Sequence, residues 1–474
     1  MTIDDPARPD TAEAPTTPES AAANGKGTWS ALRPLVLRLH FYAGVLIAPF
    51  LLVAATSGLL YALSFQAEKV LYAHELEVPV GDKVLPLSQQ VHAATKVNPN
   101  GTVTAVWPSA EDGATTRVLM ADPDVEEGKS LAVFVDPYTA EIRGQLPSFG
   151  SSGALPLRTW LDELHADLHL GELGRNYSEL AASWLWVIAL GGLLLWIGRK
   201  RKNRRALIVP ERGPKSRRRT RSWHGSVGLW AVTGLVLLSA TGLTWSRYAG
   251  ENIDMVREQL GGATPSVSAT LEGATAGGSG HEGHGSGHGG GHQTPAAKGP
   301  DVGIDQVVEA ARAKGIEGKM SVVLPSEGKG YVVKETDTQF PVHLDSVAVN
   351  PADGTVMDEL RFADYPVLAQ LTRFGIDAHT GVFLGLFNQL ALAALALSLI
   401  LLILWGYRMW WLRRPGRPVA RGAWRKVPPT MLLPLLAVTA LVGWFVPMLG
   451  LSLLAFLVVD LALGLLARAR SKAA

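Results

Sequence analysis

Residues 37–61 read LRLHFYAGVLIAPFLLVAATSGLLY, and residues 221–245 read RSWHGSVGLWAVTGLVLLSATGLTW. Each stretch contains an apolar run of the roughly 20 residues that a helix needs to cross a bilayer core of about 30 Å. When His40 is set on His224, the following residues match without a gap: Gly44 with Gly228, and Ser57-Gly58-Leu59 with Thr241-Gly242-Leu243. These matches extend over about five turns of helix, and they predict a duplicated membrane unit.

Further apolar runs complete the predicted fold class, a polytopic α-helical membrane protein of about six spans with duplicated two-helix units. Each helix pair encloses a long polar segment with the character of an extracytoplasmic α+β domain. The last two spans are separated only by residues 447–450, which suits either a tight helical hairpin or one re-entrant unit. We divide the chain into a disordered cytoplasmic tail at 1–32, spans at 33–64, 179–198, 222–246 and 379–412, outer domains at 65–178 and 247–378, basic loops at 199–221 and 413–428, and two final spans within 429–470.

Basic residues in the short loops predict the orientation of the chain. Residues 199–221 contain twelve Lys and Arg and one acid, and residues 407–426 contain seven basic residues and no acid. Loops with an excess of Lys and Arg stay in the cytoplasm. We therefore expect a multi-pass protein of the inner (cytoplasmic) membrane with both termini cytoplasmic, and we expect no binding to nucleic acid.

The two outer segments repeat the same order of predicted elements. In the first, residues 87–97 suit a helix, and four segments suit strands: 102–107, 116–120, 131–135 and 140–144. In the second, residues 304–313 suit a helix, with strands predicted at 319–324, 330–335, 342–349 and 355–358. The phrases VDPYTAEIRG and VNPADGTVMD occupy matching places. The duplication therefore includes the outer domains as well as the helices.

Several classes of chemistry are excluded by what the sequence lacks. The chain has 474 residues and no cysteine, so it has no disulfide, no thiolate metal ligand and no covalent attachment of c-type haem. It contains no phosphate loop, zinc-protease motif, nucleophilic serine elbow or dinucleotide fingerprint. These absences argue against an ATPase, a protease, and a reductase with its own nucleotide-binding domain.

Histidines at the ends of the predicted spans are the candidate functional residues. His40 and His224 lie at the same depth on the cytoplasmic side, and His165, His169 and His379 lie just before the second and fourth spans on the outer side. Ionisable side chains at such depths are costly and usually functional. Two facing imidazoles suit the two axial positions of one haem iron, and a second set suits another. The alternative is that these histidines cap helix ends and that the matched glycines only serve helix packing.

The glycines that follow the histidines support the haem hypothesis. Gly44 and Gly228 each stand four residues after a histidine, on the same helix face, and leave room for a flat macrocycle. The outer ligand of the first half stays open between two residues. The repeat favours His169, which precedes Trp196 by 27 residues, as His379 precedes Trp405 by 26.

A second group of histidines lies in a linker at 264–300 that is rich in Gly and Ser. The group consists of His281, His284, His288 and His292, in the phrase HEGHGSGHGGGH. Four imidazoles on a flexible loop suit loose binding of Cu, Zn or Ni. The alternative is a spacer of low complexity without a metal.

Four phrases together resemble the PepSY-associated transmembrane proteins: residues 37–61, LHADLHLGELGRNYSELAASWLWVIALGGLLLW at 164–196, RSWHGSVGLW at 221–230 and IDAHTGVFLGLFNQ at 376–389. The resemblance covers roughly residues 33–414. It implies PepSY modules outside the membrane, and two b-type haems with ligands that include His40, His224 and His379. In the family pattern the histidine before the second span matches His165, with an apolar residue where this chain has His169. Members are described as iron-regulated membrane proteins, and some as ferric-siderophore reductases.

These observations lead to one functional hypothesis and two alternatives. The hypothesis is a transmembrane electron carrier with two b-type haems, which reduces an extracytoplasmic ferric siderophore or another metal complex with electrons from quinol or a cytoplasmic donor. The first alternative is a membrane protein whose PepSY modules bind a partner or protease without redox activity. The second is a copper- or zinc-handling protein that uses the His-rich loop. The last two spans and the His-rich insertion lie outside the family pattern, so they leave the substrate open.

Overall fold

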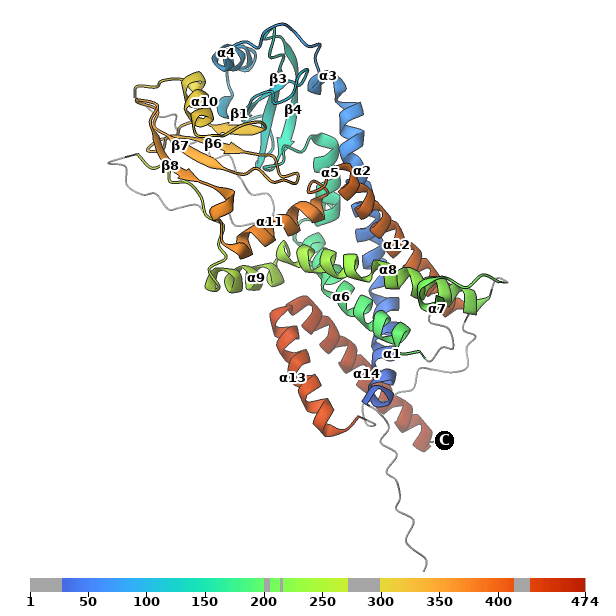
Figure 1. Ribbon diagram of the computed structural model, residues 1–474. Coiled ribbons are helices and arrows are strands. Elements are labelled where there is room, and N and C mark those ends of the chain that lie inside the picture. The colour runs from blue at the N-terminus through green and yellow to red at the C-terminus, as the bar shows by residue number, and fades with distance from the viewer. Residues whose placement is uncertain (1–27, 200–204, 214–215, 272–298, 413–426, 474) are drawn as a thin grey trace, which may run out of the picture.

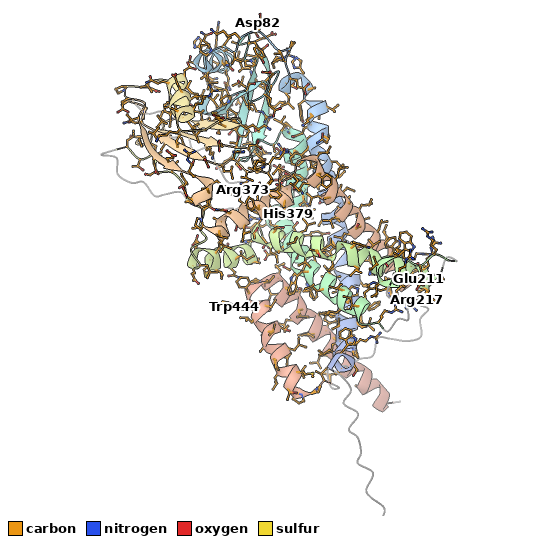
Figure 2. The ribbon with its side chains drawn as sticks, viewed as in Figure 1. Asp82, Glu211, Arg217, Arg373, His379 and Trp444 are labelled. Carbon is orange, nitrogen blue, oxygen red and sulfur yellow. The ribbon has the colours of Figure 1, made fainter. Side chains whose placement is uncertain are left out.

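A computed structural model describes residues 28–199, 205–213, 216–271, 299–412 and 427–473 of the chain. A bundle of long helices carries a single β-sheet at one end (Figure 1). The basic segments around residues 205–219 lie at the other end of the bundle, where Glu211 and Arg217 are labelled in Figure 2. The four histidines of the His-rich linker lie outside the described residues.

Five of the described helices are long and apolar enough to cross a membrane: α2 (Ala48–Leu71), α6 (Glu172–Ile197), α8 (Arg217–Thr244), α12 (Leu386–Trp411) and α14 (Pro447–Ala473), the last over Pro447–Leu466. The sixth predicted span corresponds to α13 (Pro429–Phe445), which has 17 residues and is shorter than a full span. The structure therefore supports a multi-pass membrane protein with five spans by length.

The first predicted span consists of two helices, α1 (Thr28–Leu46) and α2, with Ile47 between them. Pro49 has no amide hydrogen and cannot donate to the carbonyl four residues earlier. That carbonyl, on Val45, instead accepts a hydrogen bond of 2.9 Å from the Tyr407 hydroxyl of α12. The break in the first helix is thus compensated by the second half of the duplicated unit.

Helices α2, α6, α8 and α12 form the bundle, in which α8 packs against both α6 and α12, and α2 packs against α12. Small residues allow close approach, as expected where helices pack in a membrane. An added Cβ at Gly225 would lie 2.2 Å from the Trp196 ring, and one at Gly234 would lie 2.6 Å from Leu395. At these two crossings the missing side chain of the glycine therefore lets the neighbouring helix pack its side chain directly against the backbone.

The last two helices form a hairpin beside the bundle (Figure 1). Gly443 and Gly450 face each other so closely that an added Cβ on Gly450 would lie 2.2 Å from the Gly443 carbonyl oxygen. The Trp184 indole of α6 donates a 2.8 Å hydrogen bond to Ser452. Of the two arrangements predicted for this region, the structure has the helical hairpin.

The sheet lies beyond the bundle and has eight strands in the order β4-β3-β2-β1-β5-β6-β7-β8. Its first half is α4 (Leu87–Val97), β1 (Thr102–Trp107), β2 (Thr116–Ala121), β3 (Lys129–Val135) and β4 (Ile142–Phe149). Its second half is α10 (Ile304–Ala313), β5 (Met320–Val323), β6 (Tyr331–Glu335), β7 (Ser346–Val349) and β8 (Val356–Leu360). Both predicted helices and all eight predicted strands are present, with ends shifted by up to five residues.

The two halves of the sheet join at one seam, where β1 and β5 pair antiparallel and Val106 stands opposite Val322. Both residues are fully buried, in a core that also includes residues of α4 and α10. The sequence suggested two outer domains. The structure instead has one continuous sheet with one shared hydrophobic core, because the free edges of the two repeats satisfy each other's backbone groups.

Four shorter helices connect the sheet to the bundle: α3 (Ala73–Leu76), α5 (Pro156–Ala166), α9 (Tyr248–Gln259) and α11 (Val367–Thr380). A 3-10 turn, Phe362–Asp364, precedes α11, and a short helix α7 (Arg205–Ile208) lies at the basic end. In Figure 1, α5 and α11 lie at the junction between the sheet and the long helices. Each of these two helices carries one of the predicted site histidines in its last turn.

Candidate functional site

His40 on α1 and His224 on α8 face each other inside the bundle. Their ring centroids are 6.3 Å apart, and the ring planes are inclined by 73°. The sequence predicted that these two histidines share one depth. The structure brings them together as a pair, at the end of the bundle away from the sheet; we call them the inner pair.

Both imidazoles of the inner pair have a defined tautomer. His40 Nδ1 lies 2.9 Å from the Ile188 carbonyl oxygen, and His224 Nδ1 lies 3.0 Å from the Leu402 carbonyl oxygen. A carbonyl can only accept, so Nδ1 carries the hydrogen in both rings and Nε2 keeps its lone pair. An imidazole oriented in this way through Nδ1 is the usual arrangement of a metal-binding histidine.

The second helices of the two repeats supply equivalent partners to this pair. Ile188 and Leu402 each stand 16 residues after the first residue of their helix, α6 and α12. Four residues further on, Gly192 and Gly406 border the two rings: an added Cβ would lie 2.9 Å from His40 Cε1 and 4.0 Å from His224 Cε1. Sequence motifs give no signal for these two glycines until the first residues of α6 and α12 are known.

His165 on α5 and His379 on α11 form a second, outer pair of equivalent residues. His165 Nδ1 lies 2.9 Å from Ser57 Oγ, and His379 Nδ1 lies 2.6 Å from Thr241 Oγ1. An added Cβ at Gly58 would lie 3.2 Å from the His165 ring, and one at Gly242 would lie 3.5 Å from the His379 ring. The matched Ser-Gly and Thr-Gly pairs of the sequence are therefore the places where the two outer imidazoles rest.

Each hydroxyl of the outer pair also lies near backbone carbonyls of its own helix. Ser57 Oγ is 3.0 and 3.1 Å from the Val53 and Ala54 carbonyls, and Thr241 Oγ1 is 2.8 and 3.3 Å from the Leu237 and Leu238 carbonyls. When a hydroxyl donates to one of these carbonyls, it accepts from the imidazole, so that Nδ1 carries the hydrogen and Nε2 keeps its lone pair. Burial lowers the pKa of His379 to about 3, and the nearby His165 adds to the lowering. Burial also lowers the pKa of His165, so both rings are neutral and able to bind a metal.

His169 is placed apart from both pairs. It has a positive φ of 55° in the turn after α5, its ring packs 5.0 Å from that of Trp160, and its Nδ1 lies 3.4 Å from the Glu163 carboxylate. The structure therefore sets His165, and not His169, in the position equivalent to His379. His165 stands seven residues before the start of α6, and His379 stands seven residues before the start of α12.

Open space lies beside the inner pair at the two glycines singled out in the sequence. An added Cβ at Gly44 would meet no atom within 4 Å, and one at Gly228 would meet only the Leu402 side chain, at 3.6 Å. A flat ligand between the helices needs such space.

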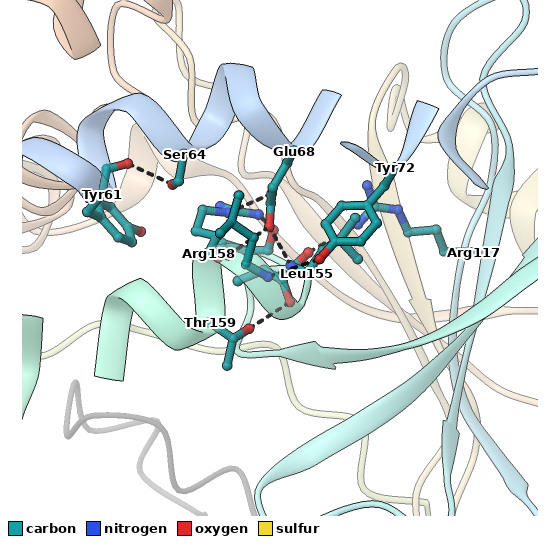
Figure 3. A network of polar contacts seen from close by, with 12 residues as sticks. Tyr61, Ser64, Glu68, Tyr72, Arg117, Leu155, Arg158 and Thr159 are labelled. Carbon is teal, nitrogen blue, oxygen red and sulfur yellow. Dashed lines mark hydrogen bonds and ion pairs between the residues drawn. The ribbon is translucent and has the colours of Figure 1, made fainter. Parts of the chain in front are cut away.

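A buried carboxylate holds α5, and with it His165, against α2 (Figure 3). Glu68 Oε1 accepts hydrogen bonds from the amides of Leu155 and Arg158, at 3.0 and 3.2 Å. Its Oε2 accepts from Arg158 Nε at 3.0 Å, and both side chains of this ion pair are 8% exposed. A carboxylate is favourable at a helix N-terminus, where amide hydrogens have no partner within the helix.

Glu179 of α6 holds α9 in the same manner. It is buried, and its two carboxylate oxygens accept from the amides of Tyr248 and Ala249, each at 3.0 Å. Sequence reasoning overlooked both Glu68 and Glu179. The only signal for them was an acid within or beside an apolar run, which is costly unless it is paired.

The bundle thus presents four neutral imidazoles in two layers. Ser57 follows His40 by 17 residues, as Thr241 follows His224, which at about 1.5 Å per residue separates the layers by roughly 25 Å. Among the described residues, no group of three or more His, Asp or Glu side chains is arranged to hold a metal ion. The four imidazoles therefore suit a cofactor that brings its own equatorial ligands, as haem does.

The family model described as PepSY-associated TM region matches residues 37–413, which is most of the chain. The match includes all five predicted cofactor-binding histidines of the membrane region and the entire β-sheet. No curated protein matches the sequence.

Proposed function

The chain belongs to the PepSY-associated transmembrane family, and we propose that it carries electrons through the membrane on two b-type haems to reduce an extracytoplasmic ferric chelate. One observation carries the proposal: four half-buried imidazoles in two layers each have Nδ1 within hydrogen-bond distance of a carbonyl or hydroxyl oxygen. The inner haem would be held by His40 and His224. The outer haem would be held by His165 and His379.

Bound haem would supply an iron that accepts and gives up one electron at a time. The protein's own residues would hold the haems and orient the imidazoles that bind them. The Ile188 and Leu402 carbonyls and the Ser57 and Thr241 hydroxyls orient the imidazoles and make them better donors.

The chelate would be reduced on the sheet side, which the basic loops at the opposite end assign to the outside. One electron converts one ferric ion to ferrous. Hard oxygen ligands bind ferrous iron more weakly than ferric, so reduction releases the metal. A ferric siderophore is the substrate class that fits best, with electrons from quinol or another donor at the cytoplasmic side.

The decisive test is the absorption spectrum of the purified full-length protein, expressed with ample haem. We expect a reducible b-type spectrum with close to two haems per chain. A colourless protein would refute the proposal. A coloured protein that is not reoxidised by any ferric chelate would refute the assigned reaction while leaving the haems in place.

Substitution of single histidines tests the ligands. His40→Ala and His224→Ala should each remove about half of the haem, and so should His165→Ala. His169→Ala is the matched control, because its ring lies four residues from His165 and outside the pair. Full haem content in His165→Ala together with loss in His169→Ala would overturn the assignment of the outer layer.

A further inference from the structure

A cavity of about 410 Å³ lies between α8 and α12 at the basic end of the bundle. Its lining consists of Arg219, Thr220, Trp223, Trp405 and Arg408. Ligand pockets of proteins span about 300–1,000 Å³, so this cavity suits a small molecule the size of a mononucleotide. None of these residues takes part in the four-imidazole site.

The cavity lies directly behind the inner pair. Trp223 precedes His224 in the chain, and Trp405 precedes Gly406, the glycine that borders the His224 ring. The cavity therefore adjoins the helix turns that carry His224 and Gly406. A ligand here would be close to the inner haem without competing for its axial positions.

The charge of the lining favours an anion. Arg219 Nη1 donates to the Gly213 carbonyl at 3.2 Å, and Arg408 donates to the Thr220 hydroxyl. Within the described part of the chain, neither arginine forms an ion pair, and no acid lines the cavity. The neighbouring Arg218, by contrast, is paired with Glu211 at 2.8 Å. Two guanidinium groups with remaining donors are typical of a phosphate site.

The two indoles favour a planar ring next to that anion. Their centroids are 5.8 Å apart with the planes inclined by 55°, and Trp223 is 37% exposed. The gap between them is too narrow for a third ring, so a ligand would stack on the exposed face of one indole. Offset stacking of aromatic rings contributes about 0.5–1.5 kcal/mol beyond the area that is buried.

We infer that this cavity binds a flavin mononucleotide, with the phosphate at Arg219 and Arg408 and the ring on an indole, and that the reduced flavin is the cytoplasmic electron donor. The role of the flavin as electron donor rests on the proposed function, whereas its binding to the cavity does not. Reduced flavin releases two electrons and two protons. With haem bound, the two electrons would pass one at a time to the inner haem and would reduce two ferric ions in all, and the two protons would leave to the solvent at the basic end.

Binding is tested without reference to haem chemistry. The full-length protein in phosphatidylcholine nanodiscs is titrated with oxidised flavin mononucleotide by calorimetry. We expect saturable binding, weakened at least tenfold by Arg219→Gln and by Arg408→Gln, and at least tenfold weaker for riboflavin, which lacks the phosphate. Arg217→Gln is the control at the same helix end and should bind as the parent does. Arg408→Lys should retain most of the affinity, and it reports on the site if Arg408→Gln fails to fold.

Three results would overturn the inference. They are absence of saturable binding, binding that survives both glutamine substitutions, and loss of binding when phosphatidylglycerol replaces part of the phosphatidylcholine, which would assign the cavity to a lipid headgroup. Haem content of the same samples is read from their absorption spectrum. A haem-containing protein that binds no flavin rejects only this inference, and a flavin-binding protein without haem rejects the proposed function and the electron-donor part of this inference while leaving the flavin site in place.

Discussion

At the scale of single residues, the site depends on which nitrogen of each imidazole is free. Carbonyl oxygens hold the two rings of the inner pair, and hydroxyls hold the two rings of the outer pair. The two kinds of partner differ in whether a substitution can remove them. A main-chain carbonyl cannot be removed by substitution, whereas Ser57 and Thr241 can be changed one at a time.

Ser57→Ala removes the acceptor that orients His165. Loss of such a partner typically lowers metal affinity by about 10–100-fold, so we expect the outer haem to be lost first on dilution or during purification. Thr56→Val is the control, because Thr56 is the adjacent residue, is exposed, and donates only to the Leu52 carbonyl at 2.8 Å. Haem content and a redox titration are measured. Equal haem retention in the two variants would contradict the role of Ser57.

Asp162, one turn before His165 on α5, makes the protein sensitive to pH. Burial raises its pKa to about 6, although Arg158 opposes the rise. Between about pH 4 and 6 the folded protein binds more protons than the unfolded chain, so stability falls as pH increases through this range. Asp162→Asn should stabilise the protein at pH 7.5 by on the order of 1–3 kcal/mol and change little at pH 4.

Thermal unfolding of the parent and Asp162→Asn at both pH values measures the effect. Asp82→Asn is the control, since Asp82 is exposed at the far tip of the sheet (Figure 2). A stabilisation by Asp162→Asn that is equal at pH 4 and pH 7.5 would show that the carboxyl is not the cause.

At the scale of elements, the sequence predicted most helices and strands, because hydrophobic runs and alternation report directly on burial. For the outer ligand of the first half, the repeat favoured His169 and the family resemblance favoured His165, and the structure places His165 in the position equivalent to His379. The count of residues back from Trp196 and Trp405 assumed that these two tryptophans hold equivalent positions in α6 and α12. The structure aligns the repeats by Gly171 and Gly385, which both have φ of 56° before α6 and α12. Such a backbone feature has no distinctive sequence pattern.

Gly44→Leu tests the space that α1 offers to the inner haem. The structure has nothing within 4 Å of an added Cβ there, so the protein should fold, with a gain of up to about 1 kcal/mol in helix propensity. A leucine would occupy the space that a haem needs, so inner haem content should fall by more than half. Gly464→Leu on α14, where an added Cβ also meets nothing within 4 Å, is the control. Full haem content in Gly44→Leu would show that the macrocycle lies elsewhere.

At the scale of the whole molecule, the two repeats meet twice. In the bundle, α8 packs on both α6 and α12, and in the sheet β1 pairs with β5. The sequence could not predict the second meeting, because β1 and β5 each resemble ordinary strands and lie more than 200 residues apart. Their pairing depends on two open edges facing each other, which only the packed bundle arranges.

Because one core serves both halves of the sheet, the halves should unfold together. Val322→Ala on β5 leaves a cavity in this core and should cost about 2 kcal/mol. Hydrogen exchange should then accelerate in β2 and β3 of the first half as much as in β6 and β7 of the second. Val80→Ala, at an exposed site, should change neither. Faster exchange confined to β6 and β7 would mean that the seam joins two independently stable domains, and each repeat would then behave as the separate outer domain that its sequence suggests.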